Sequence, residues 1–424
     1  MTGLKYSASV LFFTLLIYSC APVPTQPQNE VDVEYEFAWD FLNVFFLFQE
    51  RLPEEPFQFE SPTELYESVN EPYTVYYAPG EREDLDDMLT TSSVGLGIRI
   101  DSVENGFVIT EVFPQSPADE AGLRENDTII AVDGVDVRDF SYDQFMPLID
   151  GQRGDQVTIT VRRNSETVDI TVTLDRFVAP SVFVDSLDEN IAYIYISSFF
   201  SSTIVEGGTA QEFQDALNET QWAEITILDL RDNPGGEVEP CVLVTSQFLE
   251  PGTPIVETRE RRLIPDTVEG ETVESTWVAL DVQNNAIDRE FILLVNEFTA
   301  SASEILVSSL LANRDDIISV GSTTFGKGRG QALSVTPRSG LAVVTYAMLE
   351  PANGVAYDMI GIEPTVEVQE DEDPLEVALE IAENNLARYT SDIRFRYLRR
   401  IFFLHQSQSR RVGVPLSIIR NSLY

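Results

Sequence analysis

The chain has 424 residues, room for two or three domains, and its 43% hydrophobic and 23% charged residues are ordinary for a globular protein. Its charge is not ordinary, because 71 acidic residues stand against 27 basic ones and give a net charge of −44. This acid excess excludes nucleic acid as an expected partner. Together with the scarcity of lysine it indicates adaptation to salt, with an acidic exported protein of no special habitat as the alternative.

The first twenty residues predict an export signal. Lys5 supplies a positive charge ahead of an apolar run, residues 10–17, that is too short to span a bilayer. The run ends in Ile17-Tyr18-Ser19-Cys20, which resembles the lipobox of bacterial lipoproteins, where the cysteine carries the lipid. We therefore expect residues 1–20 to be a lipoprotein-type signal peptide and residues 21–35 to be a linker. A plain secretory leader with an incidental cysteine is the alternative.

Residues 36–92 are predicted to form an N-terminal helical region. Apolar side chains recur there at helical spacing, and Pro53 and Pro56 end the pattern. The recurring residues are Phe37, Phe41, Val44, Phe45 and Phe48. We expect this stripe to be a packed helix face or a partner-facing one, which makes it a candidate interface for a homo-oligomer.

Short strands with turn signals follow in residues 93–175. Five segments come in order: 94–98, 107–109, 116–123, 126–134 and 157–161. This order resembles a PDZ domain in the circularly arranged form found in bacterial proteases. The resemblance implies that the loop Gly95, Leu96, Gly97 and Ile98 binds the C-terminal carboxylate of a peptide through backbone N–H groups, while the peptide adds as an extra strand.

Residues 176–385 alternate between strand and helix patterns. Residues 225–230 and 291–295 are nearly continuous apolar runs, as expected for strands of a sheet covered on both faces. Residues 257–285 are polar and predict an inserted loop or hairpin. Cys241 is the only cysteine besides Cys20, so the chain without its leader can form no intrachain disulfide, and its apolar neighbours predict a core residue.

One serine and one lysine indicate the chemistry. Lys327 is the only lysine beyond residue 20, and it lies between two glycines. Ser301 follows a predicted buried strand at the start of a predicted helix, where free N–H groups are available. A serine nucleophile needs a base, and a lysine serves when burial lowers its pKa. The only histidine, His405, lies in a terminal segment of odd composition, so the sequence favours a Ser-Lys hydrolase, with Ser303 as a competing nucleophile.

Four segments resemble those of the carboxyl-terminal processing peptidases, also called tail-specific proteases. They are residues 228–236, 299–305, 325–331 and 361–364. Residues 70–77 resemble the segment that precedes the PDZ domain in this family, with Glu71 where aspartate is more usual. The resemblance implies a multidomain α+β protein: an N-terminal helical segment, a β-rich PDZ domain, and an α/β protease core of mixed sheet and helices that is crotonase-like.

The resemblance also implies a role for each site residue. Ser301 is the nucleophile, Lys327 the general base and Gln331 the group that orients the lysine. Backbone N–H groups of Ala302 and of Gly235 or Gly236 hold the oxyanion. Glu304 has two readings, a group that tunes the site or a cap of the helix start. No metal and no other cofactor is expected.

Two features depart from the family pattern. Asp150, before Gly151, stands where many relatives have an arginine that links peptide binding to the protease site, which puts gating by the PDZ domain in doubt. The tail, residues 386–424, holds eight arginines and one acid, Asp392. We expect this tail to dock on the acidic body, a second subunit or an anionic lipid surface, with a disordered extension as the alternative.

The sequence thus predicts a serine endopeptidase that is lipid-anchored in the bacterial cell envelope, on the periplasmic side. It would take protein substrates by accessible C-terminal tails through the PDZ domain. A non-catalytic PDZ scaffold that retains the protease fold is the alternative, motivated by Asp150 and the basic tail.

Overall fold

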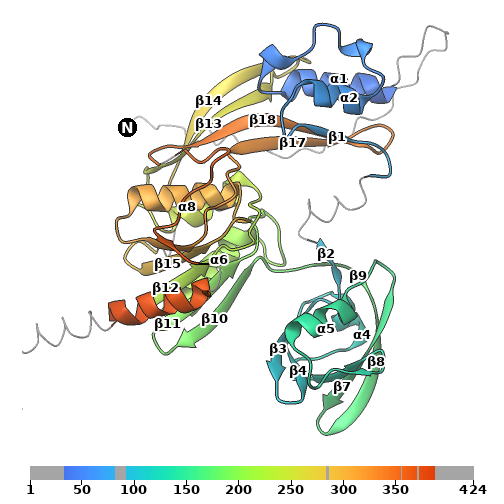
Figure 1. Ribbon diagram of the computed structural model, residues 1–424, viewed down its shortest axis with the longest axis vertical. Coiled ribbons are helices and arrows are strands. Elements are labelled where there is room, and N and C mark those ends of the chain that lie inside the picture. The colour runs from blue at the N-terminus through green and yellow to red at the C-terminus, as the bar shows by residue number, and fades with distance from the viewer. Residues whose placement is uncertain (1–32, 82–91, 283–285, 355, 370–371, 387–424) are drawn as a thin grey trace, which may run out of the picture.

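The computed structural model describes residues 33–81, 92–282, 286–354, 356–369 and 372–386. A helical N-terminal lobe, a central body of strands and helices, and a β-rich domain follow one another along the long axis (Figure 1). The predicted signal peptide with Cys20, most of the predicted linker and nearly all of the basic tail lie outside the described residues.

The N-terminal lobe contains α1 (Val33–Phe45), α2 (Pro62–Ser68) and two 3₁₀ turns, η1 (Gln49–Arg51) and η2 (Pro56–Gln58). Ala38 and Leu42 of α1 and Leu65 of α2 are fully buried in one cluster. The lobe also contains a strand, β1 (Val75–Tyr77), so the region predicted as helical is helical only in part.

The aromatic stripe expected on the first helix is only partly buried. Phe41, Phe45 and Phe48 pack at the edge of the cluster, while the fully buried face of α1 carries smaller side chains. The helix also ends earlier than Pro53, because the N–H of Leu47 donates to the carbonyl of Thr345 at 2.9 Å. This hydrogen bond draws the chain onto a strand of the central body.

The predicted PDZ domain is a curved sheet with strand order β3-β4-β5-β7-β8. Its elements are β2 (Ser92–Gly95), β3 (Ile98–Val103), β4 (Gly106–Val112), α4 (Pro117–Ala121), β5 (Thr128–Val132), β6 (Val135–Asp136), α5 (Tyr142–Ile149), β7 (Gln156–Arg163), β8 (Glu166–Thr173) and β9 (Asp175–Val178). Phe107 and Phe145 pack in its core with ring centroids 4.2 Å apart. Among the described strands β3 pairs only with β4, so its other edge is open.

The central body is built on a six-stranded sheet with order β10-β11-β12-β15-β16-β19, parallel from β11 onward. Its elements are β10 (Val182–Asp188), β11 (Ile191–Ile196), α6 (Gly208–Glu219), β12 (Ile225–Asp229), α7 (Val238–Ser246), β15 (Glu290–Val295), α8 (Ala302–Asn313), β16 (Ile318–Gly321) and β19 (Val366–Glu367). Phe291 and Leu293 pack in one cluster with α6, α7 and α8, and Ile292 and Leu294 pack in another with the helix at residues 374–386. Both faces are covered, which explains the continuous apolar runs.

A second sheet joins the N-terminal lobe to the central body. It consists of β13 (Pro254–Leu263), β14 (Gly270–Val278), β17 (Arg329–Val335), β18 (Leu341–Pro351) and β1. β13 and β14 form an antiparallel hairpin, which confirms the hairpin reading of that polar stretch. β1 pairs with β18 in the register Val75↔Val343, and β17, the strand that follows Lys327, pairs with the other edge of β18.

Candidate active site

Ser301 stands on a strained turn between β15 and α8. Its backbone has φ 56° and ψ −116°, a conformation that is rare for a residue with a side chain. Neighbouring bonds hold the turn, because Thr299 Oγ1 donates to the Leu230 carbonyl at 2.8 Å and the Ala300 N–H donates to the Asn233 carbonyl at 3.0 Å. Strain of this kind persists where surrounding structure over-determines it, and it clusters at active sites.

Ser303, the competing serine, lies in a different environment. Its side chain is fully buried, and its hydroxyl donates to the Asn233 carbonyl at 3.2 Å. Ser301, in contrast, is partly exposed. Only Ser301 of the two is therefore accessible to a substrate.

Glu304 joins the serine turn to the lysine loop. One oxygen, Oε2, accepts the N–H of Ser301 at 2.9 Å and that of Lys327 at 2.7 Å. The other, Oε1, accepts the N–H of Gly326 and the hydroxyl of Thr324, each at 2.6 Å. Burial raises the pKa of Glu304, and these hydrogen bonds counter it by lowering the pKa. Glu304 thus caps the helix start and also holds the backbone of both Ser301 and Lys327.

Lys327 points its amine at a neutral acceptor. Its Nζ donates to Gln331 Oε1 at 2.6 Å and lies 5.6 Å from the centre of the Tyr73 ring. Gln331 in turn donates through Nε2 to the Tyr73 carbonyl at 2.9 Å. Burial lowers the pKa of Lys327 below its ordinary value of 10.5, while the charges of Glu304 and Glu71 raise it. Burial is the larger effect, so the amine loses its proton more readily than in water.

Glu304 accepts hydrogen bonds from the backbone of both Ser301 and Lys327, whose side chains are not bonded to each other. Among the described residues no hydrogen bond joins Ser301 Oγ to Lys327 Nζ. In resting enzymes such a bond is often long and tightens only when substrate binds.

The expected oxyanion donors lie around the same turn. A Cβ added to Gly235 would be 2.7 Å from Ser301 Cβ and 2.8 Å from Ala302 N, so this glycine backs directly onto the serine. The N–H of Gly235, however, already donates to Asn233 Oδ1 at 2.9 Å. The N–H groups of Gly236 and Ala302 have no acceptor within the described part of the chain. These two groups are therefore the free donors next to Ser301.

The predicted carboxylate-binding loop turns at Gly97, and two of its carbonyls are hydrogen-bonded within the domain. Gly97 has φ 76°, and its carbonyl accepts the N–H of Phe113 at 3.0 Å, while the Leu96 carbonyl accepts the N–H of Ala118 at 2.9 Å. The carbonyls are thus turned into the domain. Asp150 ends α5 as its C-cap and is exposed.

Three groups of the site were missed by sequence reasoning. Tyr73 supplies a ring and a carbonyl, Glu71 pairs with Arg329, and Asp358 accepts from Arg329 Nη2 at 3.1 Å. The only available signal was the position of Glu71 and Tyr73 in the segment ahead of the PDZ domain. Nothing in the sequence around Asp358 distinguishes it from other acids.

The described residues contain no group of three or more side chains suited to hold a metal ion. Nor does any helix among them have the length and apolar character needed to cross a membrane.

Comparison with known proteins gives two family matches. The model of peptidase family S41 matches residues 190–368, and the PDZ domain model matches residues 94–174. A carboxyl-terminal-processing protease of Synechocystis sp. is 31% identical over 75% of this chain and 74% of its own length. The carboxy-terminal processing protease CtpA of Bacillus subtilis is 27% identical over 72% of this chain.

The chain spans 62% of the length of that Bacillus relative and 50% of a probable CtpA-like serine protease of Staphylococcus haemolyticus. Among solved structures, an S41 protease from Bacteroides fragilis matches with a TM-score of 0.54 at 17% identity, covering 85% of this chain and 99% of the other. That likeness bears on the fold, which is the S41 fold with a PDZ domain and an N-terminal helical segment. The chain therefore belongs to peptidase family S41, among the carboxyl-terminal processing proteases.

Proposed function

We propose that the protein is a serine endopeptidase in which Ser301 attacks the peptide bond and Lys327 is the general base. The observation that carries the proposal is the setting of the lysine amine. It is partly buried, it faces the neutral Gln331, and its pKa is lowered by that burial. A carboxylate in the place of Gln331 would hold the proton on the amine and prevent it from acting as a base.

The reaction follows from these positions. Neutral Lys327 takes the proton of the Ser301 hydroxyl as Oγ bonds to the substrate carbonyl carbon. The N–H groups of Gly236 and Ala302 hold the resulting oxyanion, an interaction commonly worth about 3–4 kcal/mol for each donor. The lysine ammonium then gives its proton to the leaving amine, and water hydrolyses the acyl-enzyme with the same base.

We propose further that the substrates are proteins with accessible C-terminal tails, which bind to the PDZ domain. Support comes from the loop at residues 95–98, in which the carbonyls of Leu96 and Gly97 are bonded within the domain, and from the open edge of β3. A peptide can add to such an edge as a strand while the loop binds its carboxylate.

The test is cleavage of an unfolded protein with an apolar C-terminus by the full chain. We expect Ser301→Ala and Lys327→Ala each to lower kcat/KM by about 10⁴-fold or more. Ser303→Ala is the matched control and should retain most of the activity, because its hydroxyl contacts only a buried carbonyl. A chelator should leave the rate unchanged.

Two results would contradict the mechanism. An active Lys327→Ala protein would show that another group is the base. A folded wild-type protein that binds the tail peptide and cleaves nothing would favour the scaffold, which Asp150 and the basic tail first suggested.

We also propose that the protein is anchored by a lipid on Cys20 and acts in the cell envelope, on the periplasmic side of a bacterium. The motif Ile17-Tyr18-Ser19-Cys20 supports this, although it lies outside the described residues. Labelling with a radioactive fatty acid should occur in wild type and fail in Cys20→Ser; equal labelling would refute the anchor.

Light scattering on the full chain tests whether the aromatic helix and the basic tail join subunits.

A further inference from the structure

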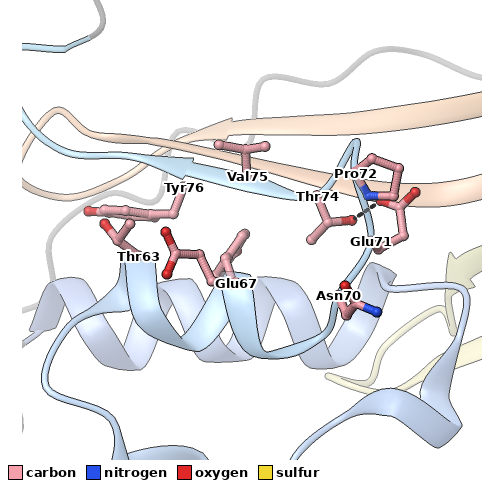
Figure 2. Close-up of a pocket in the computed structure, with 9 residues that line it drawn as sticks. Thr63, Glu67, Asn70, Glu71, Pro72, Thr74, Val75 and Tyr76 are labelled. Carbon is pink, nitrogen blue, oxygen red and sulfur yellow. Dashed lines mark hydrogen bonds between the residues drawn. The ribbon is translucent and has the colours of Figure 1, made fainter.

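The segment from Asn70 to Thr74 connects α2 to β1 and passes beside the strand that follows Lys327. Its acid, Glu71, has a fully buried side chain. Figure 2 shows Glu71 at the turn next to Pro72, with a hydrogen bond to Thr74, at the end of a cavity lined by α2 and β1. A carboxylate so deeply buried is costly unless it is well paired.

Glu71 is fully paired. Its Oε2 accepts the N–H of Tyr73 at 3.0 Å and the hydroxyls of Thr74 and Thr345 at 2.7 and 2.6 Å. Its Oε1 accepts Arg329 Nη1 at 2.5 Å. The same carboxylate therefore fixes the turn at Tyr73 and the first residue of β17.

The contacts of Glu71 with Tyr73 and with Arg329 both connect it to Lys327 through neighbouring side chains. The Tyr73 carbonyl holds Gln331, whose other end holds the Lys327 amine. The Tyr73 ring lies under the Lys327 amine at 5.6 Å and under the Arg329 guanidinium at 5.8 Å. Asp358 completes the set by binding Arg329 from the other side. The orientation of the base is thus set by an acid from the first lobe, far away in sequence.

We propose that Glu71 is a positioning residue for the reaction: it locks Tyr73 and Arg329 so that Gln331 holds the Lys327 amine in its working orientation. This inference rests on the proposed function of Lys327 as the base. It makes the N-terminal lobe a working part of the active site. Glu71 itself need not touch the substrate.

A second buried acid provides a matched control. Glu34 of α1 is 5% exposed, as is Glu71, and it also ties the first lobe to the β17–β18 hairpin. It accepts the hydroxyls of Tyr76 and Thr336 and the N–H of Arg338. Thr336 and Arg338 lie at the turn of the hairpin and Tyr76 lies in β1, and none of these three contacts involves Lys327, Gln331 or Tyr73. Loss of Glu34 should therefore weaken the fold without disturbing the base.

The experiment compares wild type with Glu71→Gln, Glu71→Asp and Glu34→Gln. Each protein is assayed for kcat and KM on an unfolded protein, for its unfolding midpoint, and for acylation of Lys327 by a trace anhydride as a function of pH. Lys327 is the only lysine beyond residue 20, so mass spectrometry of its peptide reports the titration of the base without ambiguity.

We expect Glu71→Gln to lower kcat by about 10²-fold with KM changed little, since a small misplacement of a reacting group costs this much. The direction in which the pKa of Lys327 changes separates a loss of its orientation from a loss of the Glu71 charge. Glu71 raises the pKa of Lys327, as Glu304 does, so removal of its charge alone makes the amine neutral at a lower pH and the enzyme faster there. A slower enzyme whose lysine titrates at the same or a lower pH therefore identifies a positioning role.

Glu71→Asp keeps the charge and should recover kcat to within about 10-fold of wild type. Glu34→Gln should lower the unfolding midpoint and leave kcat and the titration unchanged. The inference is overturned if Glu71→Gln keeps the wild-type kcat, or if both Gln variants lose kcat equally.

Failure of the proposed function gives a different result. If wild type cleaves nothing, the endopeptidase proposal falls, but acylation still reports the lysine. A titration that changes in Glu71→Gln and not in Glu34→Gln would then uphold the link from Glu71 to Lys327. An identical titration together with an identical rate of Lys327 acylation in all four proteins would refute the link.

Discussion

Gly235 lies against the serine turn with φ 103° and leaves no room for a side chain. An added Cβ would meet Ser301 Cβ and the Ala300 carbonyl, each at 2.7 Å. Because these contacts are with the turn itself, Gly235→Ala must displace the nucleophile, and we expect kcat/KM to fall by about 10²-fold.

The control for this variant is Gly252→Ala. Gly252 has φ 89°, and nothing lies within 4 Å of an added Cβ, so the substitution carries backbone strain without a clash. Its kcat/KM should equal that of wild type, while its unfolding free energy falls by about 1–3 kcal/mol. Equal kcat/KM in the two variants would show that the turn does not depend on Gly235.

The pH dependence of cleavage follows from Lys327. The base must be neutral, and burial places its pKa below 10.5, so kcat/KM should rise with pH and level off before that value is reached. The unfolded chain binds the proton more tightly than the folded one, so this group's contribution to the unfolding free energy also rises with pH in the same window.

Lys327→Arg tests this reading, because a guanidinium stays charged at every accessible pH. We expect this variant to be inactive throughout the range in which wild type gains activity. A pH–rate profile that does not change between pH 6 and 10 in wild type would contradict a lysine base.

At the scale of elements, the proposed capture of a C-terminal tail depends on the loop between β2 and β3. Gly97 has φ 76°, and an added Cβ would lie 2.3 Å from Ser116 Cβ. Gly97→Ala should therefore distort the carboxylate-binding loop and weaken binding of a C-terminal peptide by about 10-fold or more.

The control is Gly134→Ala in the same domain, because Gly134 has φ 78° and open space around an added Cβ. This control should bind the peptide as wild type does. Fluorescence anisotropy with a labelled apolar peptide measures both variants. If Gly97→Ala binds normally, the peptide is held elsewhere.

The sequence predicted those elements whose own residues form a recognisable apolar or polar pattern. The buried strands β12 and β15 are continuous apolar runs, and the β13–β14 hairpin is a polar stretch between them. The end of α1 and the strand β1 were not predictable, because both depend on pairing with β18 far along the chain. Tertiary contacts of this kind override local preference.

The site was likewise predictable only where a residue stands out in the sequence itself. Lys327 and Ser301 stood out because lysine is so scarce and because the serine lies between a strand and a helix. Glu71 and Asp358 could not be singled out among 71 acids, since what distinguishes them is burial against Arg329. The contacts of Glu304 also needed coordinates, because nothing in the sequence shows that the residue at the helix start also accepts hydrogen bonds from the lysine loop.

At the scale of the whole molecule, the net charge of −44 opposes the compact state. Salt screens this repulsion, as the Debye length falls from about 30 Å at 0.01 M to about 3 Å at 1 M. We expect the unfolding midpoint to rise between these two concentrations by about 2–4 °C for each kcal/mol of repulsion removed.

Calorimetry in sodium chloride checks this, with sucrose as the control because it favours compact states without screening charge. A midpoint that rises in sucrose but not in salt would contradict the reading of the acidity as adaptation to salt.

The hydrogen bond between Glu71 and Arg329 joins residues 258 positions apart. A ribosome releases the first of these residues long before the second. Until β17 and β18 have emerged, Tyr73 has no Gln331 to hold, and the serine turn and lysine loop have not yet met on Glu304. The proposed site is therefore assembled only after β17 and β18 have been made and have packed against the first lobe, so a chain still in synthesis up to that point cannot cleave its own unfolded segments.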